Sequence, residues 1–195
     1  VNKDKKKMDF LQQITWRPGI GDPTFMGWLT VFVYFLTALL AAMMAWRNHH
    51  KGEEGTQEAG LFWGGLALLL VFLGINKQLD LQTLLTDIGR ALALSQGWYE
   101  GRRGIQLLFV LGLIFAGFKA SKWLKKRFTT IRRENPYALL GLAFLGTFVV
   151  IRAVSFHLID HIIDLAPLGI RLNWVLELTG LFCIDFSAIR HLLGR

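Results

Sequence analysis

The chain has 195 residues, of which 53% are hydrophobic and 18% charged, and its formal net charge is +8. This composition excludes a disordered chain, a collagen and a coiled coil, and the single cysteine, Cys183, excludes an internal disulfide. The basic residues concentrate between Lys119 and Arg133, in a segment that joins two apolar runs. The position of the basic residues is therefore typical of a loop that sets the orientation of a membrane protein, and it argues against nucleic-acid binding.

Long apolar runs predict an all-α membrane protein with a single transmembrane domain over residues 1–195. Phe25 to Trp46 has no charge over 22 residues, which is enough for a helix to cross about 30 Å of hydrocarbon. Glu177 and Asp185 interrupt the last run, so four crossings are the alternative if that run lies in the interface. The predicted crossings are residues 25–46, 59–76, 105–124, 136–163 and 172–190.

Five tryptophans lie near the ends of these runs, the distribution typical of the aromatic belts at membrane interfaces. They are Trp28, Trp46, Trp63, Trp123 and Trp174.

The segment after the second crossing predicts an amphipathic helix over residues 77–96. Its polar residues recur at a spacing that brings them to one face of a helix. This helix either prolongs the second crossing or bends to lie on the membrane surface. The residues of the polar face are Asn76, Asp80, Thr83, Asp87 and Arg90.

The Lys119–Arg133 loop sets the predicted orientation, because short loops rich in Lys and Arg stay in the cytoplasm. The 47–58 loop and the C-terminus then face inward as well, whereas the 77–104 and 164–171 connections face outward.

A metal site is one interpretation of the fourth crossing. His157, Asp160, His161 and Asp164 share one face of a helix at spacings of i, i+3, i+4 and i+7. Two imidazoles one turn apart, completed by carboxylates, can bind a divalent metal such as zinc. A hydrogen-bonded structural network and a solvated helix end are the alternatives.

Further polar residues are expected in the same outward-facing layer, where they would form a pocket. Arg152 lies deeper than the others and needs a partner, for which Glu177 or Asp185 is a better candidate than Asp160. A bound anionic group is the functional alternative to such an ion pair. The predicted pocket consists of Asn76, Lys77, Asp80, Arg152 and Glu177.

Three stretches together resemble a group of small bacterial integral membrane proteins of uncharacterised function. The resemblance covers most of the chain and implies a bacterial inner membrane, but it implies no activity. The stretches are INKQLDLQ at 75–82, GWYEGRR at 97–103 and RAVSFH at 152–157 with Asp160.

The grouping of Ser155, His157, Asp160 and His161 is similar to that of membrane-embedded ceramidase-type hydrolases, in which Ser, Asp and His residues on several helices hold zinc. Those enzymes have seven crossings, whereas this chain has about five and no second histidine-bearing helix. No residue role is therefore carried over.

Two functions follow from these patterns. The favoured one is a non-catalytic subunit or scaffold of a membrane complex, whose polar layer pairs internally, with another membrane protein or with a second copy. The alternative is a membrane-embedded metal-dependent enzyme or metal-binding protein acting on a lipid-like or periplasmic substrate. A proton or ion pathway is disfavoured, because the acidic groups cluster at one end of the crossings.

Overall fold

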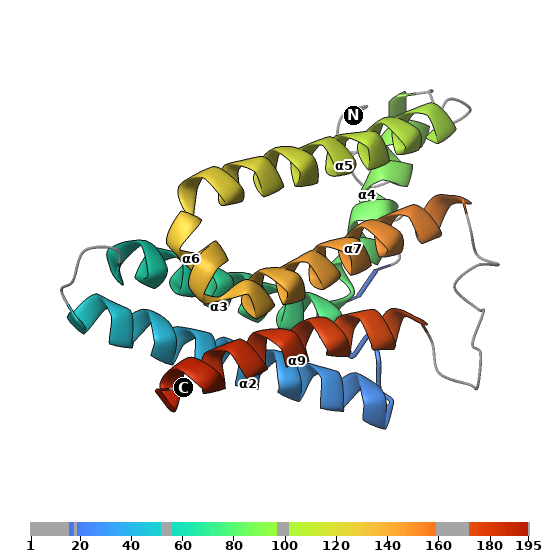
Figure 1. The fold of residues 1–195 in the computed structure, drawn as a ribbon. Helices are drawn as coiled ribbons and strands as arrows, with labels where there is room; N and C mark the ends of the chain where they lie inside the picture. Colours follow the sequence, from blue (N-terminus) through green and yellow to red (C-terminus); the bar gives the residue numbers. More distant parts are fainter. Residues whose placement is uncertain (1–15, 18, 52–55, 97–101, 159–171, 195) are drawn as a thin grey trace, which may run out of the picture.

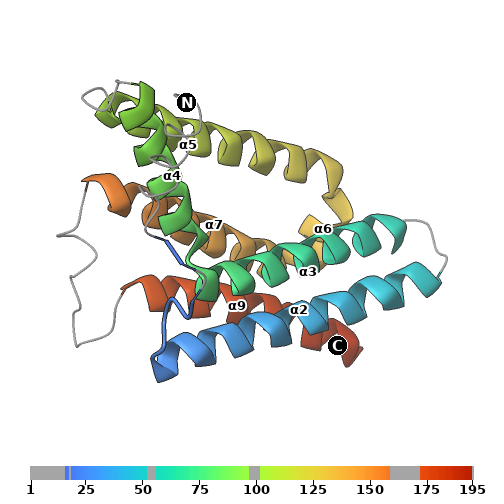
Figure 2. The ribbon, with the colours of Figure 1, turned by 180° about the vertical axis from the view of Figure 1, so that it is seen from behind.

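The computed structural model describes residues 16, 17, 19–51, 56–96, 102–158 and 172–194, and all regular structure in this part of the chain is helical, as the sequence predicts. Figures 1 and 2 show the arrangement from opposite sides. The helices are α2 (Phe25–Lys51), α3 (Thr56–Leu79), α4 (Leu81–Gln96), α5 (Arg102–Arg127), α6 (Thr129–Glu134), α7 (Pro136–Leu158) and α9 (Leu172–Leu192).

Three of the described segments are long and apolar enough to cross a membrane: Phe25–His50, Thr56–Leu79 and Leu107–Leu124. Helix α7 contributes a shorter apolar segment, Pro136–Arg152. Large hydrophobic side chains face outward over much of the surface, for example Leu68 with 74% of its area exposed. Such a surface suits contact with lipid, because a water-soluble domain rarely exposes apolar patches of this extent.

Helices α2, α3, α7 and α9 form a bundle around one hydrophobic core. Helix α2 packs along α3, α7 packs along α9, and α2 also contacts α9. Trp63 lies at the centre of this core with none of its area exposed. The assignment of Trp63 to an interfacial aromatic belt was therefore wrong, whereas Trp28, Trp46 and Trp123 are half or more exposed.

Helices α7 and α9 bring their backbones close together where two glycines face each other. A Cβ atom on Gly141 would overlap the carbonyl oxygen of Gly180 and lie 2.7 Å from Cγ1 of Ile184. A Cβ atom on Gly180 would lie 3.0 Å from the carbonyl oxygen of Gly141. Small residues at such a crossing let two membrane helices bring their backbones together.

A break at Asp80 separates α3 from α4, and Asp80 has a positive φ of 46°. Asp tolerates this left-handed conformation better than most residues do. The polar residues between Asn76 and Arg90 therefore lie on two helices of different direction (Figure 2), not on one continuous helix face. The sequence left open whether this segment prolongs the second crossing or bends away from it, and the structure shows a bend.

The segment before α2 contacts this break. The amide of Gly21 donates to the carbonyl of Gln78 at 2.6 Å, and the indole of Trp16 donates to the carbonyl of Leu79 at 2.9 Å. The backbone amide of Trp16 also donates to the carboxylate of the buried Asp87 at 2.9 Å. The bonds to Gln78 and Leu79 occupy carbonyls at the end of α3 that have no partner within the helix, and the bond to Asp87 ties the same segment to α4.

A candidate functional site at one end of the bundle

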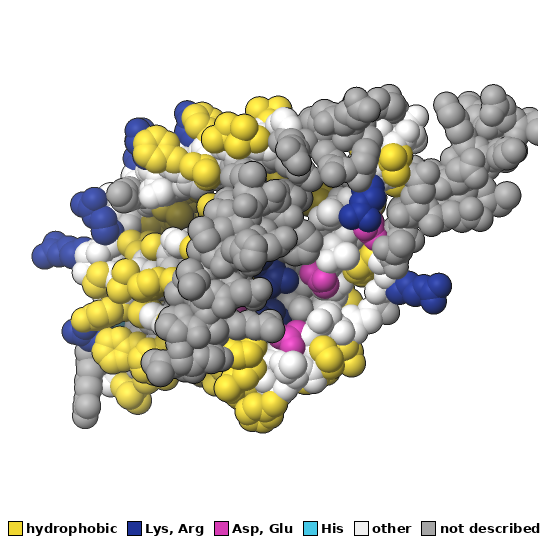
Figure 3. Space-filling view, turned by 90° about the vertical axis from the view of Figure 1, so that its right-hand side faces the viewer, with side chains coloured by type: hydrophobic (Ala, Val, Ile, Leu, Met, Phe, Trp, Pro, Cys, Tyr) yellow, Lys and Arg dark blue, Asp and Glu magenta, His cyan; other side chains and the backbone are white. Residues whose placement is uncertain are grey.

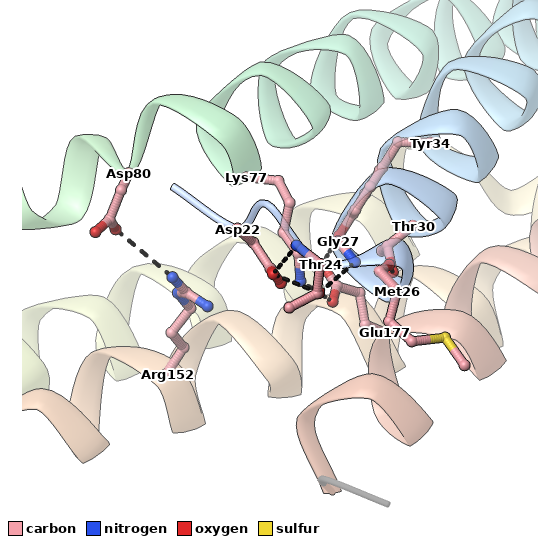
Figure 4. Close-up of polar contacts among 10 residues, drawn as sticks. All are labelled: Asp22, Thr24, Met26, Gly27, Thr30, Tyr34, Lys77, Asp80, Arg152 and Glu177. Carbon is pink, nitrogen blue, oxygen red and sulfur yellow. Dashed lines mark hydrogen bonds and ion pairs between the residues drawn. The ribbon is translucent and has the colours of Figure 1, made fainter. Parts of the chain in front are cut away.

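Five polar side chains from five parts of the fold gather at the end of the bundle where α3 stops. We call them the polar cluster: Tyr34 of α2, Lys77 of α3, Asp80 of the break, Arg152 of α7 and Glu177 of α9 (Figure 4). Viewed from this end, basic and acidic side chains lie next to one another among hydrophobic ones (Figure 3). The topology thus brings residues up to 143 positions apart in sequence to one place.

The centre of the polar cluster is a buried ion pair. Nζ of Lys77 lies 2.7 Å from Oε2 of Glu177, and these side chains expose 8% and 1% of their area. The hydroxyl of Tyr34 donates to the other oxygen, Oε1, at 3.0 Å. Each carboxylate oxygen of Glu177 therefore accepts one hydrogen bond, which is what a buried charge needs to be tolerated.

A second, more exposed ion pair lies beside the first. Nη2 of Arg152 is 3.6 Å from Oδ1 of Asp80, and each side chain exposes about a third of its area. The Thr83 hydroxyl donates to Oδ2 of Asp80 at 2.6 Å. The expected partners of Arg152 were Glu177 or Asp185, but the structure pairs it with Asp80. Glu177 forms its ion pair with Lys77, which reaches it from the last turn of α3, and not with Arg152.

Local sequence features hold these side chains in place. Gly74, one turn before Lys77 on α3, leaves room for α2, since a Cβ atom there would lie 3.1 Å from that of Tyr34. At the start of α2, the Thr24 hydroxyl accepts from the amide of Gly27 at 3.1 Å and donates to Asp22 at 2.6 Å. This is an N-cap, which fixes where α2 begins. Asn76 contributes its backbone carbonyl, which accepts from the amide of Asp80 at 3.0 Å.

Tyr34 is the member of the polar cluster that the sequence prediction missed. It lies within the longest uncharged run, where hydropathy alone gives it no role. A usable signal was present, because Thr30, Tyr34 and Thr37 follow one another at helical spacing and so share one face. All three are buried in the structure.

The predicted metal residues lie in a different part of the chain. Asp160, His161 and Asp164 fall outside the described residues, and the side chain of His157 is not among those described. Within the described part, no group of three or more His, Cys, Asp or Glu side chains could hold a metal ion. The zinc hypothesis therefore stays a prediction of the sequence.

Metal analysis tests that hypothesis directly. If the histidines of the fourth crossing bind zinc, purified full-length protein retains about one metal ion per chain, and a His157→Ala, His161→Ala variant loses it because two ligands are gone. Elemental analysis after size-exclusion chromatography gives the ratio. A His49→Ala, His50→Ala variant is the control, since these histidines lie at the exposed end of α2. Wild-type protein without bound metal would remove the hypothesis.

Taken together, the polar cluster pairs acids with bases and leaves its two carboxylates bonded by side chains of the same chain. Such an arrangement fixes helices relative to one another. Comparison with known proteins adds no further identification: no family model, no curated protein and no solved structure matches this chain.

Proposed function

We propose that this chain is a bacterial inner-membrane protein with five crossings that serves as a non-catalytic subunit or scaffold of a membrane complex. The observation that carries the proposal is the internal pairing of the polar cluster. Lys77 and Glu177 join α3 to α9, and Asp80 and Arg152 join the α3–α4 break to α7. Charged side chains that already pair with one another favour a structural role over a catalytic one.

The distribution of charge supports the proposed orientation. Exposed basic residues gather near the end of α5 and on α6, while the polar cluster lies near the start of α5 and the break after α3, at the other end of the bundle (Figure 1). By the positive-inside rule the basic end faces the cytoplasm. The polar cluster then faces the opposite side. The exposed basic residues are Lys119, Lys122, Lys126, Arg127, Arg132 and Arg133.

Helix α5 supports a role in assembly. None of the described side chains in its apolar segment Leu107–Leu124 is classed as buried, and Leu108 and Phe115 expose 69% and 62% of their area. Gly112, Ala116 and Ala120 follow one another four residues apart, the spacing by which small residues mark helix contacts in membranes. A Cβ atom on Gly112 would have no neighbour within 4 Å. We assign this face of α5 to a helix of another membrane-protein subunit.

Native mass spectrometry of the protein in lipid nanodiscs, purified from its own membranes, tests the proposal. We expect a discrete complex heavier than the 22.1 kDa chain. A Gly112→Leu variant should release the monomer, because the larger side chain keeps the two helices apart.

A Gly146→Leu variant is the matched control, since Gly146 is an exposed helix glycine with an equally empty surrounding. It should leave the complex intact. A monomeric wild-type protein would overturn the assembly role, whereas a complex that survives Gly112→Leu would overturn the assignment of α5 as its contact. A complex made only of this chain would show that a second copy, not a different subunit, occupies α5.

A further inference from the structure

One face of helix α5 carries basic side chains at the end of the segment that is apolar enough to cross a membrane. Lys119 and Lys122 belong to the candidate span Leu107–Leu124, and Lys126 follows one turn after Lys122. At about 100° per residue the three lysines fall within an arc of about 60°, and all three are exposed. We call these three residues the lysine face.

Aromatic side chains accompany the lysine face. The ammonium nitrogen of Lys119 lies 5.5 Å from the ring centroid of Phe115, and that of Lys122 lies 4.5 Å from the ring centroid of Phe118. Both rings belong to the preceding turn, so both ammonium groups lie back over the apolar segment and not beyond its end. Trp123, with 59% of its area exposed, lies on the same side of the helix, and Trp is typical of the level of the lipid headgroups.

The charge of the lysine face is not neutralised within the described part of the chain. No carboxylate there forms an ion pair with Lys119, Lys122 or Lys126. The stretch 119–133 holds seven basic residues and no acidic one. Because an ammonium group at the border of a hydrocarbon layer is costly without a counter-charge, that counter-charge has to come from outside these helices.

We propose that the lysine face binds the phosphate headgroup of an anionic phospholipid such as phosphatidylglycerol. A lipid fits both parts of this surface. Its phosphate meets the ammonium groups, while its acyl chains lie along the exposed rings of Phe115 and Phe118, toward the middle of the span. A soluble anion would match the charge but not the apolar rings.

Binding of a lipid there requires the proposed membrane position of α5 but not its contact with another subunit. The small residues from Gly112 to Ala120 lie about a quarter turn around the helix from the lysine face. A bound lipid and a partner helix can therefore lie side by side, and neither has to displace the other.

Fluorescence quenching by brominated lipids tests this proposal. The full-length protein is reconstituted in phosphatidylcholine vesicles in which a minor fraction of the lipid is brominated, either as phosphatidylglycerol or as phosphatidylcholine. Subtracting the signal of a Trp123→Phe variant isolates Trp123 from the other tryptophans. We expect brominated phosphatidylglycerol to quench Trp123 more strongly, because the lysines enrich that lipid beside the indole. The excess should shrink at high salt, since exposed charges are screened.

Charge variants connect the effect to the lysine face. In the triple variant Lys119→Gln, Lys122→Gln, Lys126→Gln, we expect the local preference for phosphatidylglycerol to fall about tenfold or more. The corresponding triple arginine variant should keep the preference, because it keeps the three charges. All three positions are exposed, so neither variant disturbs the core.

The matched control removes three exposed positive charges from other parts of the fold, with the substitutions Arg17→Gln, Arg90→Gln and Arg190→Gln. It should leave the preference unchanged. Equal quenching of wild-type Trp123 by the two lipids would overturn lipid recognition, as would a preference that survives the triple glutamine variant. Absence of quenching by either lipid would instead show that α5 lies outside the membrane, which would overturn its proposed membrane position as well.

Discussion

Replacing Lys77 by Met is expected to lower the free energy of unfolding by about 3–5 kcal/mol, because the change leaves the Glu177 carboxylate buried without its counter-charge. Glu177 exposes only 1% of its side chain, so water cannot take the place of the lysine. The Tyr34 hydroxyl would remain as its donor but carries no charge. Equilibrium unfolding in mixed micelles, followed by circular dichroism, measures the effect.

A second substitution separates the loss of the pair from the loss of the lysine. In the double variant Lys77→Met, Glu177→Gln, neither member of the buried pair carries a charge, and the side-chain oxygen of Gln can still accept the hydrogen bond from Tyr34. We expect this variant to recover most of the lost stability.

Asp80→Asn serves as a comparison, because the Asp80–Arg152 pair is about one third exposed and should contribute no more than about 1 kcal/mol. If Lys77→Met costs no more than Asp80→Asn, the polar cluster does not hold the helices together.

Replacing Gly141 by Val is expected to cost about 1–3 kcal/mol or to prevent folding, because the new side chain meets the backbone of α9. A Cβ atom there would overlap the carbonyl oxygen of Gly180 and lie 3.1 Å from the amide nitrogen of Ile184. Backbone atoms cannot rotate away as a side chain can, so α7 and α9 would have to separate. Thermal unfolding measured by loss of monodisperse protein reports the change.

Gly146→Val is the control for this prediction. Gly146 lies on the same helix, and a Cβ atom there has no neighbour within 4 Å. Both variants share the same change in helix propensity, so the difference between them isolates the α7–α9 contact. Equal melting temperatures for the two variants would contradict the close crossing.

The sequence by itself determined that the chain is helical and apolar enough for a membrane, because hydropathy and the absence of charge act over continuous runs of residues. It also indicated that Lys77, Asp80, Arg152 and Glu177 would lie near one another, since each stands near the end of an apolar run. These are local properties, and a helix expresses them whatever its neighbours are.

Only the tertiary structure decided which groups pair. The partner of Arg152 depends on how α7 is rotated toward the break at Asp80, and the burial of Trp63 depends on which face of α3 meets the core. The break at Asp80 separates polar residues that one continuous helix would have placed on a single face. The segment before α2 donates hydrogen bonds to the carbonyls at the end of α3, next to this break. Rotation and contact between helices are set by packing over long sequence separations, which no single run of residues encodes.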